Sequence, residues 1–123
     1  MQLTLHRPDR AAITAIEAQR IQVGDTWFSN SFFVSPEVGA QAWPVIDLAA
    51  LDSAALAPLL ATGAHVILLG TGSRQGFPPA AFVAEAARRR VGVEAMRNDA
   101  AARTYNVLIS EGRAALAAFI LPD

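Results

Sequence analysis

The part of this 123-residue chain with the clearest potential for chemistry is a glycine-rich loop, Gly70-Thr71-Gly72-Ser73. A loop of this kind between a strand and a helix can present backbone N–H groups to a phosphate or a carboxylate. The next glycine, Gly76, follows Gly72 by four residues, whereas the dinucleotide-binding fingerprint needs three. The loop is therefore predicted to be a tight turn. The alternative is that the N–H groups of Thr71, Gly72 and Ser73 bind a small anion or polar group.

A second polar group lies on segment 98–110, which is predicted to be a helix. Asp99, Arg103 and Asn106 are spaced by four and three residues and so share one face. An exposed Asp–Arg pair at this spacing would stabilise the helix only slightly. The alternative is that the forked, directional donors of Arg103 and Asn106 hold a carboxylate, a phosphate or a backbone segment. The candidate binding residues are Gly70, Thr71, Gly72, Ser73, Arg103 and Asn106.

The composition excludes several kinds of chemistry. The chain has no cysteine and no lysine, which rules out disulfides, thiolate nucleophiles, Schiff bases and a P-loop lysine. Its two histidines stand apart and no carboxylates are paired at metal spacing, so we predict no metal and no cofactor. Ser73 lacks the pattern of a hydrolase nucleophile, and we find no complete catalytic set. We therefore expect a protein that is not an enzyme.

Charge and hydropathy limit the class of protein further. Ten basic and eleven acidic residues give a net charge of −1, which argues against a nucleic-acid-binding domain. With 53 % hydrophobic and 17 % charged residues, we expect one folded domain over residues 1–123 with its own core. The N-terminus lacks the features of a signal peptide, and no apolar window approaches the roughly 18 residues of a membrane span. We expect a cytoplasmic protein without a membrane span.

The elements that must position the candidate residues change in type along the chain. The first half has alternating apolar, β-branched and aromatic residues bounded by turn residues, which is typical of strands. We predict strands over 2–6, 13–18, 20–23, 26–34 and 43–46.

The second half is predicted to be β-α-β-α-β. The continuous apolar run after His65 is typical of a strand buried on both faces. Proline cannot donate an internal hydrogen bond, so we expect a turn before Pro58 and a helix from there to Gly63. The later elements are a strand over 65–69, a helix over 80–90, a strand over 91–96, a helix over 99–110 capped by Asn98, and a strand over 114–121.

Taken in order, these segments resemble a known family. The most specific stretch is Arg103-Thr104-Tyr105-Asn106 with Glu111-Gly112-Arg113, supported by the Gly70-Thr71-Gly72 turn and by Val93-Glu94-Ala95-Met96. They are similar to the small-domain family of unknown function that includes mitochondrial respiratory complex I assembly factor three and the adipogenesis-associated domain proteins.

The resemblance implies a three-layer α/β domain with a mixed central β-sheet, and it brings no enzymatic activity. It implies that such a protein acts through protein–protein contact and assists the assembly of a respiratory or other membrane enzyme complex. We therefore expect a non-catalytic interaction protein with a protein partner. The alternative is a domain that binds a small ligand (an anion, a carboxylate or a nucleotide), or a minor enzyme, using the 70–73 turn with Arg103 and Asn106.

Topology connects the two groups of candidate residues. If the strands over 65–69 and 91–96 lie parallel, joined by the helix between them, both end at the same edge of the sheet. The helix that follows Asn98 then begins at that edge. We therefore predict that Arg103 or Asn106 reaches the 70–73 turn through a hydrogen bond or across a small cleft.

Overall fold

A five-stranded mixed sheet forms the middle of the structure, a computed structural model that describes residues 11–121. Its strands are β4 (Phe32–Ser35), β5 (Gly39–Ala42), β6 (Val66–Gly70), β7 (Gly92–Met96) and β8 (Ala115–Phe119). The strand order is β5-β4-β8-β6-β7. β6 is parallel to both β7 and β8, whereas β4 is antiparallel to β5 and β8. The strand that we predict over 2–6 lies outside the described residues.

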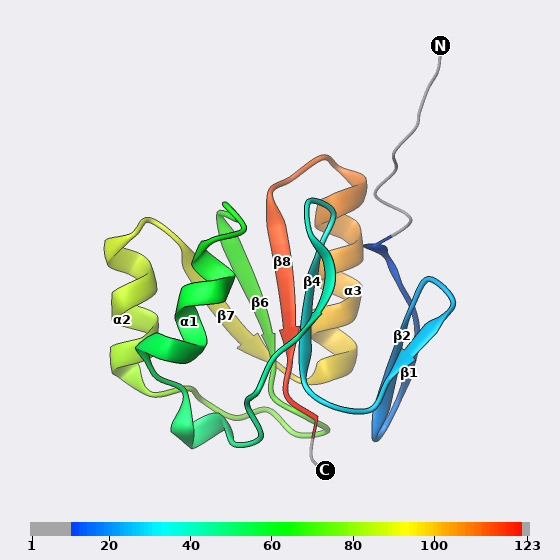
Figure 1. Cartoon of the computed structure of the whole chain (residues 1–123), viewed down its shortest axis with the longest axis horizontal. Coiled ribbons are helices and arrows are strands. Elements are labelled where there is room, and N and C mark those ends of the chain that lie inside the picture. Colours follow the sequence, from blue (N-terminus) through cyan, green and yellow to red (C-terminus); the bar gives the residue numbers. More distant parts are fainter. Residues whose placement is uncertain (1–10, 122–123) are drawn as a thin grey trace.

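Helices cover both faces of this sheet and give the fold three layers (Figure 1). One face carries α1 (Ser53–Leu60) and α2 (Ala80–Arg88). The other carries α3 (Asn98–Ser110) together with a small antiparallel sheet. The small sheet consists of β1 (Ile13–Glu17), β2 (Arg20–Val23) and β3 (Thr26–Phe28). The predicted three-layer α/β fold, with a mixed central sheet and a β-rich first half, is confirmed.

The core is divided into two clusters by the alternation of side chains along the central strands. Leu68 and Phe119 face α3, where they pack with Tyr105. Ile67 and Leu69 point the other way, toward α1 and α2. Because both faces of the sheet are covered, β6 is apolar along its whole length, as the sequence predicts.

The segment 26–34 is not the single strand that we predict. β3 ends at Phe28 and β4 begins at Phe32, and the two strands belong to different sheets. Between them Ser31 is buried, and its Oγ accepts a hydrogen bond of 2.9 Å from the N–H of Leu121. This contact fixes the point at which the chain leaves the small sheet and enters the central one.

The strand predicted over 43–46 is also wrong, because the edge strand β5 ends just before it. Pro44 has no N–H to give to a sheet. Trp43 is buried, and its indole Nε1 donates to the carbonyl of Ala55 in α1 at 3.0 Å. The segment therefore connects the edge strand β5 to helix α1.

Helix α1 begins earlier than predicted and contains Pro58. Asp52 caps the helix, since its side chain accepts a hydrogen bond of 2.9 Å from the N–H of Ala55. Leu56 and Leu59 are fully buried on either side of the proline. The cap and this burial offset the one internal hydrogen bond that proline cannot make.

The remaining elements follow the predicted β-α-β-α-β order closely. β6, α2, β7, α3 and β8 occur in the predicted places, with ends shifted by one or two residues. Within residues 11–121, no helix combines the length and the apolar character needed to cross a membrane.

Candidate functional site

The glycine-rich turn lies at the carboxyl edge of the parallel strands, where α3 also begins. Gly70 and Met96 are paired at the ends of β6 and β7. α3 begins at Asn98, two residues after β7 ends. Figure 1 shows the ends of both strands and the start of α3 together at the lower edge of the sheet. The predicted convergence of these segments is confirmed.

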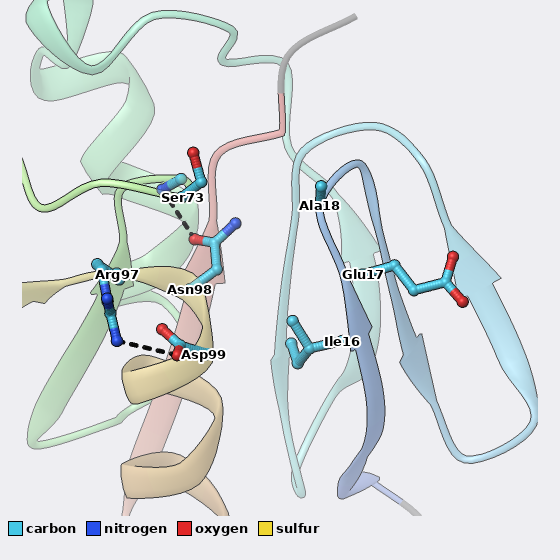
Figure 2. A pocket seen from close by; sticks show the side chains of 8 residues that line it. Ile16, Glu17, Ala18, Ser73, Arg97, Asn98 and Asp99 are labelled. Carbon is cyan, nitrogen blue, oxygen red and sulfur yellow. Dashed lines mark hydrogen bonds and ion pairs between the residues drawn. The ribbon is translucent and has the colours of Figure 1, made fainter.

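Asn98 makes the contact between α3 and the turn that we predict for Arg103 or Asn106. The N–H of Gly72 donates to Asn98 Oδ1 at 3.0 Å, as Figure 2 shows. The N–H of Asn98 donates in return to the Gly72 carbonyl oxygen at 2.8 Å. Asn98 is only 5 % exposed. Its side chain therefore closes the turn instead of capping the helix.

A second N–H group of the turn also has a partner within the protein. The N–H of Thr71 donates to the Met96 carbonyl oxygen at 2.9 Å and extends the pairing of β6 with β7. The Thr71 hydroxyl donates to the Arg74 carbonyl at 2.8 Å and accepts from the N–H of Gly76 at 3.0 Å. Of the three N–H groups that would bind an anion in the alternative interpretation, those of Thr71 and Gly72 are thus already hydrogen-bonded.

Gly70, the first residue of this turn, has no room for a side chain. A Cβ at Gly70 would lie 2.7 Å from Phe119 Cδ1 and would collide with Asn98 Oδ1. Gly72 adopts a φ of +108°, in the region that favours glycine. Both glycines are therefore required by local packing and backbone conformation.

Asn106 holds a backbone segment, one of the alternatives considered for it, but the segment belongs to β1. Its Oδ1 accepts from the N–H of Ile13 at 2.9 Å, and its Nδ2 donates to the Ile13 carbonyl at 2.8 Å. The hydroxyl of the preceding residue, the buried Tyr105, donates to the Ala11 carbonyl at 3.0 Å. These two side chains attach the small sheet to α3.

Arg103 lies on the surface, and its side chain forms no ion pair or hydrogen bond with the described residues. The i,i+4 pair with Asp99 does not form, because Asp99 pairs with Arg97 instead, at 3.1 Å. Glu111 and Arg113 form a separate exposed pair at 3.6 Å. The six candidate residues are thus divided between the turn, the α3–β1 contact and the surface. That they bind a ligand stays a prediction.

Two hollows flank the turn. The smaller, of about 220 Å³, lies between the turn, the β1–β2 connection and the start of α3 (Figure 2). We call it the Asn98 hollow; its wall includes Ile16, Ala18, Ser73, Arg97, Asn98 and Asp99. The larger, of about 400 Å³, is called the Ile46 groove; its wall includes Ile46, Leu48, Arg74, Gln75, Gly76 and Ile120.

Two large apolar side chains beside the Ile46 groove are exposed. Ile46 is 68 % exposed and Phe77 is 80 % exposed. Phe77 directly follows Gly76, where a Cβ would lie 2.6 Å from Leu48 Cδ2, so the two segments touch. Sequence reasoning missed both residues, because Ile46 lies in the strand predicted over 43–46 and Phe77 lies between the strand predicted over 65–69 and the helix predicted over 80–90. The Phe77-Pro78-Pro79 run was the signal available in the sequence.

Two ionisable groups with shifted pKa values lie apart from each other, Glu17 beside the Asn98 hollow and Tyr105 at the contact of α3 with Ala11. Arg20 hydrogen-bonds the Glu17 carboxylate at 2.8 Å and lowers the pKa of Glu17. Burial, with a smaller effect from the Glu37 carboxylate, raises the pKa of Tyr105 well above its usual value. Within the described part of the chain, no cluster of three or more histidine and carboxylate side chains is placed to hold a metal ion.

Solved structures of bacterial proteins share this fold. A Xanthomonas campestris protein solved by NMR superposes with a TM-score of 0.85 and 42 % identity, covering 98 % of this chain and 92 % of that one. A Bordetella pertussis protein described as a Mth938-like domain superposes with a TM-score of 0.80 and 30 % identity, covering 100 % of this chain and 93 % of that one. The fold is therefore that of the Mth938-like domains.

Residues 13–120 match the family described as "Protein of unknown function (DUF498/DUF598)", and the chain belongs to this family. The predicted relationship to a small-domain family of unknown function is confirmed at this level. The chain is also 36 % identical over 67 residues to the "13 kDa major membrane protein" of Francisella tularensis subsp. holarctica (strain LVS). That match spans 54 % of this chain and 54 % of the relative.

Proposed function

We propose that this protein is a cytoplasmic, non-catalytic interaction module that docks a protein partner on the Ile46 groove and assists the assembly of a membrane enzyme complex. The observation that carries the proposal is the exposure of Phe77 and Ile46 at that groove, 80 % and 68 % respectively. Leaving a side chain of this kind in water forgoes about 1.5–3 kcal/mol that burial would provide. A partner that covers both side chains recovers this free energy on binding.

The loop that carries Phe77 suits a docking role. Phe77 is followed by Pro78 and Pro79, whose rings fix their backbone φ angles. A segment that is already restrained loses less conformational entropy when a partner binds. Aromatic side chains are also enriched among the residues that dominate binding at protein interfaces.

The hydrogen bonding of the turn supports a scaffold rather than an anion site. The N–H groups of Thr71 and Gly72 are bonded to Met96 and Asn98, so an anion would have to displace protein partners. The same bonds hold the floor of the Ile46 groove in one shape, since Thr71, Gly72 and Gly76 all belong to its wall.

Two further observations support a role in the assembly of a membrane enzyme complex. The sequence resembles the family that contains a respiratory complex assembly factor, over Arg103-Thr104-Tyr105-Asn106 and Glu111-Gly112-Arg113. The Francisella relative is named a major membrane protein. The partner that we propose is a subunit of such a complex, bound through an apolar segment that the finished complex later buries.

Affinity purification of the tagged protein from its native host tests this proposal. We expect one partner to co-purify with the wild-type protein and to be lost from the double variant Ile46→Ser, Phe77→Ser. The matched control is Val107→Ser, which removes an apolar side chain that is 50 % exposed on α3. Equal recovery of the partner by the double variant, or normal complex assembly in a deletion strain, would contradict the proposal.

A further inference from the structure

The proposed docking role of the Ile46 groove leaves the Asn98 hollow, at the same edge of the sheet, without a function. Its volume of about 220 Å³ is below the roughly 300–1,000 Å³ of pockets that hold drug-sized ligands. Ile16 and Ala18 from the small sheet face Ser73 and Asn98 across it (Figure 2). The hollow therefore has an apolar side and a polar side, and its volume suits a small molecule.

The hydrogen bond to Gly72 fixes the orientation of the Asn98 carboxamide. A backbone N–H needs an oxygen acceptor, so Oδ1 must face Gly72 and Nδ2 must face away from it. Figure 2 shows Nδ2 directed into the space on the side of Ala18.

The N–H donors of Asn98 Nδ2 have no acceptor among the residues that the structure describes. Asn98 is 5 % exposed, and no hydrogen bond from Nδ2 reaches another of the residues 11–121. A buried donor without an acceptor is unfavourable, and such groups usually find a partner. This position therefore favours an acceptor atom supplied from outside the chain.

The charged groups around the hollow are already paired, which favours a neutral ligand. Arg97 pairs with Asp99 at 3.1 Å, and Glu17 pairs with Arg20 at 2.8 Å. Figure 2 shows the Glu17 carboxylate pointing away from the hollow. A carboxylate ligand would meet no unpaired cation here and would approach the Asp99 carboxylate. A cationic ligand would meet the N–H donors of Asn98 and the positive end of α3.

We propose that the Asn98 hollow binds a small neutral molecule whose carbonyl oxygen accepts a hydrogen bond from Asn98 Nδ2. The apolar body of this ligand lies against Ile16 and Ala18. The Ser73 hydroxyl, which is exposed beside the hollow, donates to the same oxygen or accepts from an amide N–H of the ligand. The hollow adjoins the Ile46 groove, since Ala18, Gly72 and Ser73 line both, but Ile16, Asn98 and Asp99 line the hollow and not the groove.

Three probes that share a phenyl ring but differ in their polar group test the class of ligand. Benzamide is neutral and offers a carbonyl, benzoate is an anion, and benzylamine is a cation without an acceptor. In an NMR titration of the full chain, we expect benzamide to shift the Gly72 and Ser73 amide signals and the Asn98 side-chain signals saturably. Benzoate should bind at least about tenfold more weakly, and benzylamine should cause no saturable shift.

Asn98→Asp is the sharpest variant, because it keeps an oxygen for the Gly72 N–H, replaces the Nδ2 donors by a second oxygen and adds one negative charge. We expect it to lose benzamide binding, while Asn30→Asp, which adds the same charge at an exposed position, keeps it. Ala18→Leu leaves every hydrogen bond in place and fills the apolar side, and it should also abolish binding. The proposal is overturned if benzamide does not bind, if benzoate binds as tightly, or if benzamide binds Ala18→Leu unchanged.

Discussion

At the scale of single residues, two asparagines of α3 attach other parts of the chain. The carboxamide of asparagine offers one acceptor and two donors and so can match a backbone peptide group. Asn106 bonds both the N–H and the carbonyl of Ile13, and Asn98 closes the turn at Gly72. The sequence indicated that Asn106 could hold a backbone segment. It did not show which segment, because Ile13 and Asn106 are 93 residues apart.

Asn106→Ala should destabilise the protein, and Arg103→Ala should not. Removing the Asn106 carboxamide leaves the N–H and carbonyl of Ile13 without partners in a half-buried position, so we expect a loss of about 2 kcal/mol. The Arg103 side chain is exposed and forms no hydrogen bond or ion pair with the described residues, so its truncation should change the free energy of unfolding by less than about 0.5 kcal/mol. Urea unfolding of both variants measures the difference. Similar losses in the two variants would contradict this assignment of roles.

Tyr105 makes the stability of the protein depend on pH in the alkaline range. It is the one tyrosine in the chain, and there is no lysine or cysteine, so no other side chain titrates near pH 10. Burial raises the pKa of Tyr105 in the folded state, so above about pH 10 the unfolded state loses this proton first. The unfolded state then binds fewer protons, and stability falls as pH rises.

The free energy of unfolding should be flat from about pH 8 to about pH 10 and then fall by about 1.4 kcal/mol per pH unit. Tyr105→Phe should remove this fall and should cost about 1 kcal/mol at neutral pH, because the hydrogen bond to the Ala11 carbonyl is lost. Urea unfolding at a series of pH values measures both effects. An equally steep alkaline fall in Tyr105→Phe would show that another group is responsible.

At the scale of elements, the sequence predicted best where a segment is buried on both faces or ends at a glycine. β6, α3 and β8 were predicted because their apolar patterns and turn residues are local signals. The break between β3 and β4 was not predicted from the sequence, because it depends on the contact of Ser31 with Leu121, 90 residues later. The start of α1 was misplaced because the burial of Leu56 and Leu59 outweighs the local effect of Pro58.

Gly70→Ala should be far more harmful than Gly92→Ala, although both glycines are in parallel strands of the same sheet. A methyl group at position 70 meets Phe119 and Asn98, so we expect a loss of about 1–3 kcal/mol. A methyl group at position 92 meets nothing within 4 Å, and stability should stay the same or rise slightly. Thermal unfolding of the two variants measures this, and equal shifts in their midpoints would contradict the close packing of β6 against α3.

At the scale of the whole molecule, the carboxyl edge of the central sheet concentrates the features without a structural role. The two faces of the sheet are covered, and their side chains form the two core clusters. The Asn98 hollow and the Ile46 groove both open beside the 70–73 turn. The position of this edge could be predicted from strand order and the glycine turn. The hydrogen bonds made by the N–H groups of the turn could not be predicted from the sequence, because they depend on how the packing of α3 orients Asn98.

Photo-crosslinking from position 77 in living cells tests most directly whether the Ile46 groove receives a protein partner. A photoreactive phenylalanine analogue replaces Phe77, which is 80 % exposed, and in a matched strain it replaces Val107 on α3. We expect one crosslinked product of constant size from position 77, reduced by Ile46→Ser in the same chain, and no such product from position 107. The same products from both positions, or none from position 77, would contradict the role of this groove in protein interaction.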